Sequence, residues 1–176
     1  MKYNYEDYIR TVEDFPKEGV KFCDIAPLLS NGAVFRASIE DMAGNVDPAV
    51  TKLVGFDARG FIFASALAHE LALGFVMLRK PGKLPGPVKQ ASYELEYGTN
   101  SIEIQTDVLG EDDVILIVDD VIATGGTALA GIELIRGCGA RIEGFQTVID
   151  LPGLGGSDRI RQAGVAVRSL VSLGEV

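Results

Sequence analysis

The chain has 176 residues, of which 47% are apolar, and its 25 acidic and 16 basic residues give a net charge of −9. This length predicts a single domain over residues 1–176, and the negative charge argues against a general nucleic-acid or anionic-membrane surface. Residues 1–10 have no apolar signal-peptide core, no apolar run approaches 18 residues, and the two cysteines lack metal-ligand spacing, so we expect a cytoplasmic protein with reduced thiols.

The first third of the chain gives weak local signals. Residues 4–13 place tyrosine, isoleucine and valine side chains at helical spacing and predict a short amphipathic helix. Asn31 is a candidate N-cap for a helix over about residues 32–43. In the loop before that helix, composition alone makes Phe22 a core residue rather than a platform for a ligand.

A strand, a loop and a helix follow in quick succession. Residues 52–56 predict the first core strand, and residues 61–71 predict a mostly buried helix. The loop between them carries Arg59, which can bind a phosphate through its planar fork of donors or form an ordinary surface ion pair. His69, the only histidine, falls in the last helical turn, where a cation suits the helix dipole. We do not expect His69 to be catalytic, because an acid–base histidine needs a placed partner.

The next segment is basic in an otherwise acidic chain. After a predicted strand over residues 74–78, residues 79–89 contain four basic side chains and no acidic one. Three prolines and two glycines leave little regular structure there. The segment is therefore either a solvated basic loop or a clamp for a polyanionic ligand.

The remaining elements complete a repeating pattern. Residues 91–97 and 101–105 alternate in the manner of strands and predict a hairpin, in which composition alone puts Glu96 on the solvent face. Later in the chain the pattern predicts a strand over 141–150, a short helix over 157–163 and a strand over 165–173. Strands that alternate with helices predict an α/β fold with a mainly parallel, doubly wound sheet.

The strongest signal is VILIVDDVIATGGT, residues 114–127. Its first five residues are apolar and largely β-branched, as in a strand buried on both faces. Asp119 and Asp120 would then stand at the carboxyl end of that strand, where open α/β sheets bind ligands. Two glycines flanked by hydroxyl groups follow and lead into a predicted helix over residues 128–136, whose N–H groups and dipole favour an anion. Residues 123–127 therefore predict a phosphate cradle.

Carboxylates beside an anion site fit a ligand that carries hydroxyl groups next to its phosphate. Ionised carboxylates can accept hydrogen bonds from two sugar hydroxyls, or they can act through Mg²⁺, which prefers oxygen ligands. A sugar phosphate satisfies both halves of the motif, whereas a bare phosphate satisfies only one. The two intervening aspartates argue against a dinucleotide G-x-G-x-x-G turn, and the chain has no G-x-x-x-x-G-K-[ST] to support a P-loop NTPase.

The same stretch resembles the phosphoribosyl diphosphate (PRPP) motif of the type I phosphoribosyltransferases, most specifically that of the members that act on adenine. The resemblance extends from about Asp14 to the C-terminus, and the separate motifs RKPGKLPG (residues 79–86) and EYG (residues 96–98) agree with it. It implies the type I phosphoribosyltransferase fold, with a hood over about residues 1–45 and a core over about residues 50–176. It also implies that the chain converts adenine and PRPP to AMP and pyrophosphate in purine salvage.

The resemblance also implies roles for individual residues. The ribose and 5′-phosphate of PRPP would be bound by Asp119, Asp120, Ala123, Thr124, Gly125, Gly126 and Thr127. Its pyrophosphate would be bound by Asp57, Ala58, Arg59, Gly60, Arg79, Lys80 and Lys83. A flexible loop near residues 88–106 would carry the catalytic Glu96. In the hood, adenine would meet Lys21, Phe22 and Cys23, with the Lys21 C=O accepting from its 6-amino group and the Cys23 N–H donating to N1.

Cofactor and partners follow from the same resemblance. Mg²⁺ would bind through PRPP near Asp119 and Asp120, with no protein ligand assigned, and we expect a homodimer that binds neither nucleic acid nor membrane. Cys23 stands where many relatives carry a basic residue, so a role that needs that charge does not transfer. Two alternatives stay open: a phosphoribosyltransferase for 6-oxopurines, and a non-enzymatic PRPP-sensing regulator, which would need no catalytic Glu96.

Overall fold

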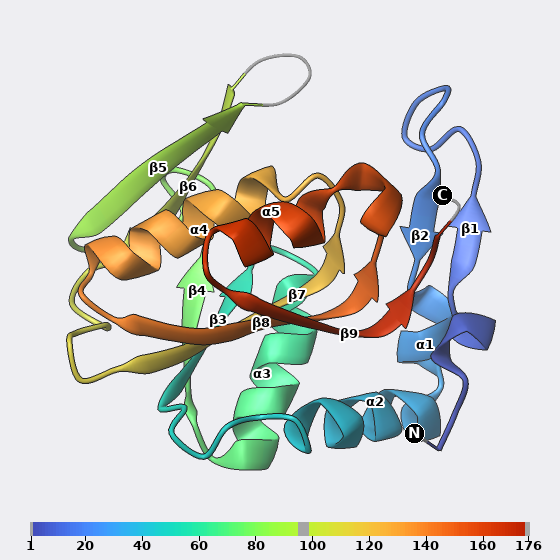
Figure 1. Ribbon diagram of the computed structural model, residues 1–176, viewed down its shortest axis with the longest axis horizontal. Coiled ribbons are helices and arrows are strands. Elements are labelled where there is room, and N and C mark those ends of the chain that lie inside the picture. The colour runs from blue at the N-terminus through green and yellow to red at the C-terminus, as the bar shows by residue number, and fades with distance from the viewer. Residues whose placement is uncertain (1, 95–98, 175–176) are drawn as a thin grey trace.

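A five-stranded parallel sheet forms the centre of the protein in the computed structural model, which describes residues 2–94 and 99–174 (Figure 1). Its strands, in spatial order, are β4 (Gly74–Leu78), β3 (Lys52–Phe56), β7 (Val114–Ile122), β8 (Arg141–Asp150) and β9 (Ala166–Ser172). Every neighbouring pair in this sheet is parallel. The predicted α/β fold with a mainly parallel sheet is therefore confirmed.

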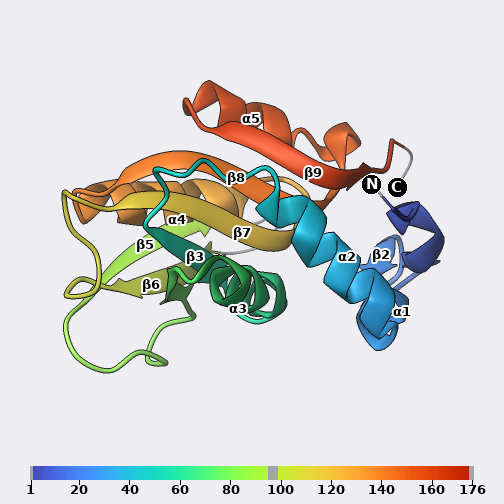
Figure 2. The ribbon, with the colours of Figure 1, turned by 90° about the horizontal axis from the view of Figure 1, so that it is seen from below.

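Helices cover both faces of the sheet (Figure 2). One face packs against α3 (Gly60–Leu71), which in turn packs against α2 (Gly32–Ala43). The other face carries α4 (Gly126–Gly137), α5 (Gly156–Gln162) and the antiparallel hairpin of β5 (Val88–Glu94) and β6 (Thr99–Gln105). The buried apolar run at the start of β7 needs this cover on both sides.

The N-terminal region differs from its prediction. Residues 4–13 form a 3₁₀ turn, η1 (Tyr5–Tyr8), and a strand, β1 (Arg10–Val12), so the predicted amphipathic helix is wrong. Contacts distant in sequence decide the outcome: Tyr5 is buried and donates a hydrogen bond of 2.5 Å to Asp41, and β1 pairs antiparallel with β2 (Phe22–Asp24). Tertiary pairing overrides a weak helical period.

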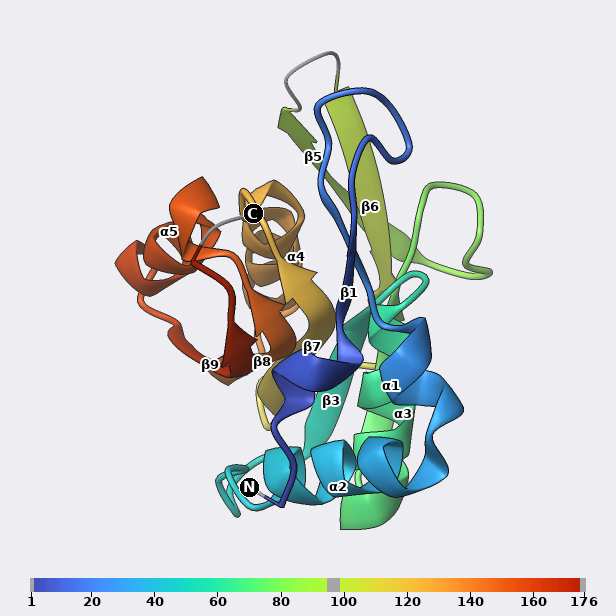
Figure 3. The ribbon, with the colours of Figure 1, turned by 90° about the vertical axis from the view of Figure 1, so that its right-hand side faces the viewer.

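The next two helices close the N-terminal region. A short helix, α1 (Ala26–Ser30), leads to Asn31, whose side chain accepts hydrogen bonds from the N–H groups of Ala33 and Val34. The predicted N-cap of α2 is thus confirmed. Figure 3 shows that the β1–β2 hairpin and the β5–β6 hairpin project toward the same end of the molecule.

The strand β7 is longer than the sequence predicted. Its ladder with β8 continues to the pair Ile122 and Asp150, so Asp119 and Asp120 lie within the strand rather than after it. Between β8 and α5 there is one further 3₁₀ turn, η2 (Pro152–Leu154). Among the described residues, none of the helices has the length and apolar character needed to cross a bilayer.

Candidate active site

A cavity of about 460 Å³ opens at the carboxyl ends of the central strands. The last part of β7 and the segments after β3, β4 and β7 supply most of its lining: Asp57, Ala58, Arg59, Arg79, Lys80, Asp119, Asp120, Ala123, Thr124, Gly125, Gly126 and Thr127. Its apolar wall includes Phe56 and Phe145, whose rings stack with centroids 6.1 Å apart. The structure therefore brings together twelve residues that the sequence analysis named as candidates, including the entire phosphate cradle.

The phosphate cradle is a tight turn between β7 and α4. Gly125 has φ of +81°, a left-handed conformation that a residue with a Cβ rarely adopts. The helix α4 begins at the next residue, Gly126. The free N–H groups of the first helical turn therefore line the cavity with the positive end of the helix dipole.

The two aspartates are crowded and poorly solvated. Asp120 is 4% exposed, and its Oδ2 lies 2.8 Å from Arg59 Nε in an ion pair that lacks hydrogen-bond geometry. Asp119 Oδ1 accepts a hydrogen bond of 2.9 Å from the Asp120 N–H. Burial raises the pKa of Asp119 well above its ordinary value, and the neighbouring Asp120 raises it further. Burial also raises the pKa of Asp120, although Arg59 opposes the shift.

The approach of α3 to this pair depends on a glycine. A Cβ at Gly60 would lie 2.6 Å from Asp119 Oδ1 and 3.2 Å from the Val118 carbonyl oxygen. Gly60 was expected to bind pyrophosphate, but it does not line the cavity. In the structure it instead packs against Asp119. The first turn of α3 can therefore pack directly against the carboxyl end of β7.

Two arginines form the basic side of the cavity. Arg79 Nε pairs with Asp57 Oδ2 at 2.9 Å, and its backbone forms a bridge with Glu103 of β6. Arg59 comes from the loop after β3, whose peptide bond between Asp57 and Ala58 is cis. Lys80 also lines the cavity. Lys83 does not, although its carbonyl oxygen accepts a hydrogen bond from Arg79 at 3.3 Å.

The residues expected to meet the base lie beside the cavity rather than in its wall. The guanidinium of Arg59 sits over the Phe22 ring, 4.8 Å from its centroid, and thus joins β2 to the cavity. Cys23 is 6% exposed, and burial raises the pKa of its thiol. Lys21 forms a long ion pair of 3.9 Å with Glu13.

The hairpin contributes residues that sequence reasoning missed. Tyr93 of β5 and Ile102 of β6 line the cavity, and Ile102 pairs across the hairpin with the buried Ala91. Alternation with period two puts Ala91 and Tyr93 on the same face, which could have revealed them once the inward face was known. Glu96, the expected catalytic residue, lies outside the described residues.

The donors in the cavity suit a metal that is carried in by its ligand. No group of three or more histidine, cysteine, aspartate or glutamate side chains within residues 2–94 and 99–174 could enclose an ion. The carboxylate pair is available, however, and Mg²⁺ is commonly held by one or two carboxylates together with substrate phosphates and water. The residues therefore fit Mg²⁺ bound with a phosphate ester.

Comparison with known proteins agrees with this geometry. The phosphoribosyl transferase domain matches residues 30–162. The adenine phosphoribosyltransferase of Aeromonas salmonicida is 46% identical over 169 residues, covering 96% of this chain and 93% of that protein, and that of Maricaulis maris is 47% identical over 165 residues, covering 93% and 94%.

Solved structures give the same answer. The crystal structure of adenine phosphoribosyltransferase from Rhodothermus marinus superposes with a TM-score of 0.90 at 44% identity, covering 96% of both chains. The enzyme from Giardia lamblia, solved with 9-deazaadenine, gives a TM-score of 0.93 at 36% identity and covers 98% of this chain and 97% of its own. The chain therefore belongs to the phosphoribosyl transferases, and within them to the adenine phosphoribosyltransferase family.

Proposed function

We propose that this protein transfers the phosphoribosyl group of PRPP to N9 of adenine, producing AMP and pyrophosphate. The observation that carries the proposal is the juxtaposition, in one cavity, of a backbone phosphate turn, a buried carboxylate pair and two arginines. A sugar phosphate with a second, strongly anionic group matches all three features. The likeness to relatives called adenine phosphoribosyltransferases supports the same reaction.

The turn and the carboxylates bind the ribose 5-phosphate part of PRPP. The N–H groups of residues 124–127 donate to the 5′-phosphate at the positive end of α4. Asp119 and Asp120 accept hydrogen bonds from the ribose hydroxyls, as ionised carboxylates can. Asp120 Oδ2 is buried without a hydrogen-bond partner in the described part of the chain, so a hydroxyl donor would satisfy it.

The basic side of the cavity binds the pyrophosphate. Arg59, Arg79 and Lys80 line it, together with Asp57 and Ala58 of the loop after β3. Breaking the bond at the anomeric carbon builds positive charge on the ribose and negative charge on the departing group. Cations that are already in place stabilise that charge without reorganising. Mg²⁺, held by PRPP oxygens beside Asp119 and Asp120, would supply further charge neutralisation of the pyrophosphate.

The hood and the hairpin complete the proposal. The Lys21 C=O and the Cys23 N–H read the edge of adenine while Phe22 packs against its ring, and Glu96 assists at the base when the hairpin tip closes. The proximity of Arg59 to Phe22 supports a base position next to the ribose. We further propose a cytoplasmic homodimer, consistent with the two free cysteines.

A panel of bases tests the proposal. Purified protein is incubated with PRPP, Mg²⁺ and adenine, hypoxanthine, guanine or uracil, and pyrophosphate release is followed. We expect adenine to be preferred by about 10⁴–10⁵-fold, because a 6-oxopurine inverts both the donor and the acceptor that the hood presents. Turnover of hypoxanthine or guanine within tenfold of adenine would refute the adenine assignment, and no pyrophosphate with any base would favour a PRPP-sensing regulator.

A further inference from the structure

The helix α5 packs against the phosphate turn, and none of its residues lines the cavity. The N–H of Gly156 donates to the Ala123 carbonyl oxygen at 3.0 Å. Arg159 Nη1 donates to the Thr124 carbonyl oxygen at 2.9 Å. Two successive peptide units of the turn are thus tied to one helix through their carbonyl groups, although α5 lies about 30 residues later in the chain.

These two hydrogen bonds fix the direction in which the N–H groups of Thr124 and Gly125 point, because the peptide unit is planar. In a planar trans peptide, the C=O of one residue and the N–H of the next point in opposite directions. Tying the Ala123 and Thr124 carbonyls to α5 therefore turns the N–H groups of Thr124 and Gly125 away from α5. In the described part of the chain neither N–H has a hydrogen-bond partner, and both residues line the cavity.

A pair of facing glycines lets the helix come this close. A Cβ at Gly125 would lie 2.9 Å from Gly156 Cα, and a Cβ at Gly156 would lie 2.2 Å from the Ala123 carbonyl oxygen. The side of Gly125 that a side chain would occupy therefore faces α5 and not the ligand. Both glycines are needed for the backbones to touch, and contact is what allows the Gly156 N–H to reach Ala123.

We propose that α5 is a template that aims the phosphate-binding N–H groups, with Gly156 and Arg159 as its positioning residues. The inference rests on the proposed function, because it assumes that a 5′-phosphate occupies the turn. Neither residue needs to touch PRPP: each acts through a carbonyl of the turn. Arg159 is exposed, so its hydrogen bond to Thr124 is accessible to substitution without opening the core.

The main experiment compares two arginines of the same short helix. Arg161 is also exposed, and its one partner among the described residues is Asp158, one turn away, so Arg161→Ala removes the same charge without touching the turn. We expect Arg159→Ala to raise KM for PRPP about tenfold, equivalent to about 1.4 kcal/mol, and to leave kcat and KM for adenine unchanged. Phosphate contacts are equally strong in the ground and transition states, which is why the loss falls on KM.

Charge and position are separated by a second pair of variants. Gly156→Ala adds a methyl group and no charge, and its matched control is Gly153→Ala, where a Cβ would meet nothing closer than 3.7 Å. We expect Gly156→Ala to raise KM for PRPP at least as much as Arg159→Ala, and Gly153→Ala to have no effect. An unchanged KM in Gly156→Ala, with a raised one in Arg159→Ala, would mean that the arginine acts through its charge, and would overturn the template.

Two further readings make the outcome decisive. Arg159→Lys keeps the charge and a hydrogen-bond donor, so it should recover most of the affinity for PRPP. The second measurement is the ratio of KM for PRPP between Arg159→Ala and wild type. This ratio should persist at about 1 M salt, where charges are screened within about 3 Å. If Gly156→Ala does not fold, the ratio of KM values at high salt is the deciding measurement. A ratio that falls to one at high salt would overturn the template. A wild-type protein that does not bind AMP by calorimetry would refute the proposed function instead, whereas normal AMP binding with an unchanged Arg159→Ala would refute only the template.

Discussion

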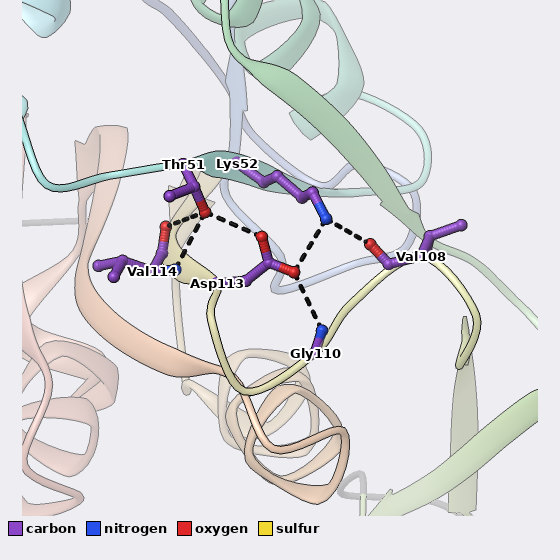
Figure 4. A network of polar contacts seen from close by, with 6 residues as sticks. All are labelled: Thr51, Lys52, Val108, Gly110, Asp113 and Val114. Carbon is purple, nitrogen blue, oxygen red and sulfur yellow. Dashed lines mark hydrogen bonds and ion pairs between the residues drawn. The ribbon is translucent and has the colours of Figure 1, made fainter.

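Carboxylates lie near both ends of the strand β7, with Asp113 directly before its first residue and Asp119 and Asp120 in its last part, and their surroundings are opposite. At the amino end, Asp113 accepts hydrogen bonds from Lys52 Nζ at 2.8 Å, the Gly110 N–H at 3.0 Å and the Thr51 hydroxyl at 3.0 Å (Figure 4). Burial alone would raise the pKa of Asp113, but these three bonds outweigh it and the pKa is lowered. At the carboxyl end, burial raises the pKa values of Asp119 and Asp120.

The difference separates a carboxylate that stabilises the fold from a pair that we propose binds the ligand. Asp113 anchors the loop before β7, since Lys52 also reaches the Val108 carbonyl oxygen at 2.9 Å. At the other end Arg59 pairs with Asp120, and Asp120 Oδ2 is buried without a hydrogen-bond partner in the described part of the chain, which costs stability in the absence of a ligand. Under-satisfied buried groups of this kind are typical of functional sites.

Removing both charges at the carboxyl end should give the largest effect on activity. Asp119→Asn with Asp120→Asn should lower kcat/KM for PRPP by about 10²–10⁴-fold, since each charged hydrogen bond to a ribose hydroxyl is worth about 1.5–3 kcal/mol. The variant should be at least as stable as wild type in urea at neutral pH, because two crowded charges are gone. Steady-state kinetics and urea unfolding check the two halves; full activity, or a large loss of stability, would contradict the comparison.

Removing the charge at the amino end should do the reverse. Asp113→Ala leaves the donors of Lys52, Thr51 and Gly110 without their acceptor and should lower the free energy of unfolding by about 1–3 kcal/mol. The catalytic constants should stay within about twofold of wild type. Asp112→Ala, at the exposed neighbouring position, is the matched control and should change neither quantity. A change in KM for PRPP in Asp113→Ala would show that the two ends of β7 are not independent.

The smallest effect is a difference in pH dependence. The lowered pKa of Asp113 adds stability that is complete above the unfolded value of about 3.9 and is lost as pH falls through the folded pKa. The raised pKa values of Asp119 and Asp120 act in the opposite sense: stability falls as pH rises from about 4 through their folded pKa values.

Urea titrations over that range check the two signs. Relative to wild type, the double asparagine variant should gain stability progressively as pH rises. The loss of unfolding free energy caused by Asp113→Ala should instead become smaller as pH falls below about 4. If the free energy of unfolding of wild type and of the double variant depended on pH in the same way, the pKa values of Asp119 and Asp120 would not be raised by burial.

Elements that depend mainly on neighbouring residues could be predicted from the sequence, whereas those that depend on distant contacts could not. The strand over residues 141–150 and the cap at Asn31 are confirmed to the residue, and the cap is purely local because the Asn31 side chain bonds N–H groups two and three positions later. The helix expected over residues 4–13 failed because Tyr5 finds its partner, Asp41, 36 positions away. The length of β7 was underestimated for a similar reason, since pairing with β8 extends it past Asp120.

The candidate site was predictable in part. The 114–127 stretch itself predicted the phosphate turn and the carboxylates, its resemblance to a known motif assigned them to PRPP, and the structure puts both in one cavity. No pattern in the sequence marks Arg159, an exposed arginine 35 positions from the carbonyl it contacts, or Tyr93 as a wall residue. Those contacts exist only once the chain is folded.

The cavity draws its walls from strands as far apart in the chain as β3, with Phe56, and β8, with Phe145, so it exists only when most of the sheet is assembled. A metabolite that binds there binds the native chain and not the unfolded one. Saturation at about 100 times Kd would then add about 2.7 kcal/mol to the free energy of unfolding. In a cell that is rich in substrate, the protein would therefore open less often to proteases, and its lifetime would follow the supply of the compound it consumes.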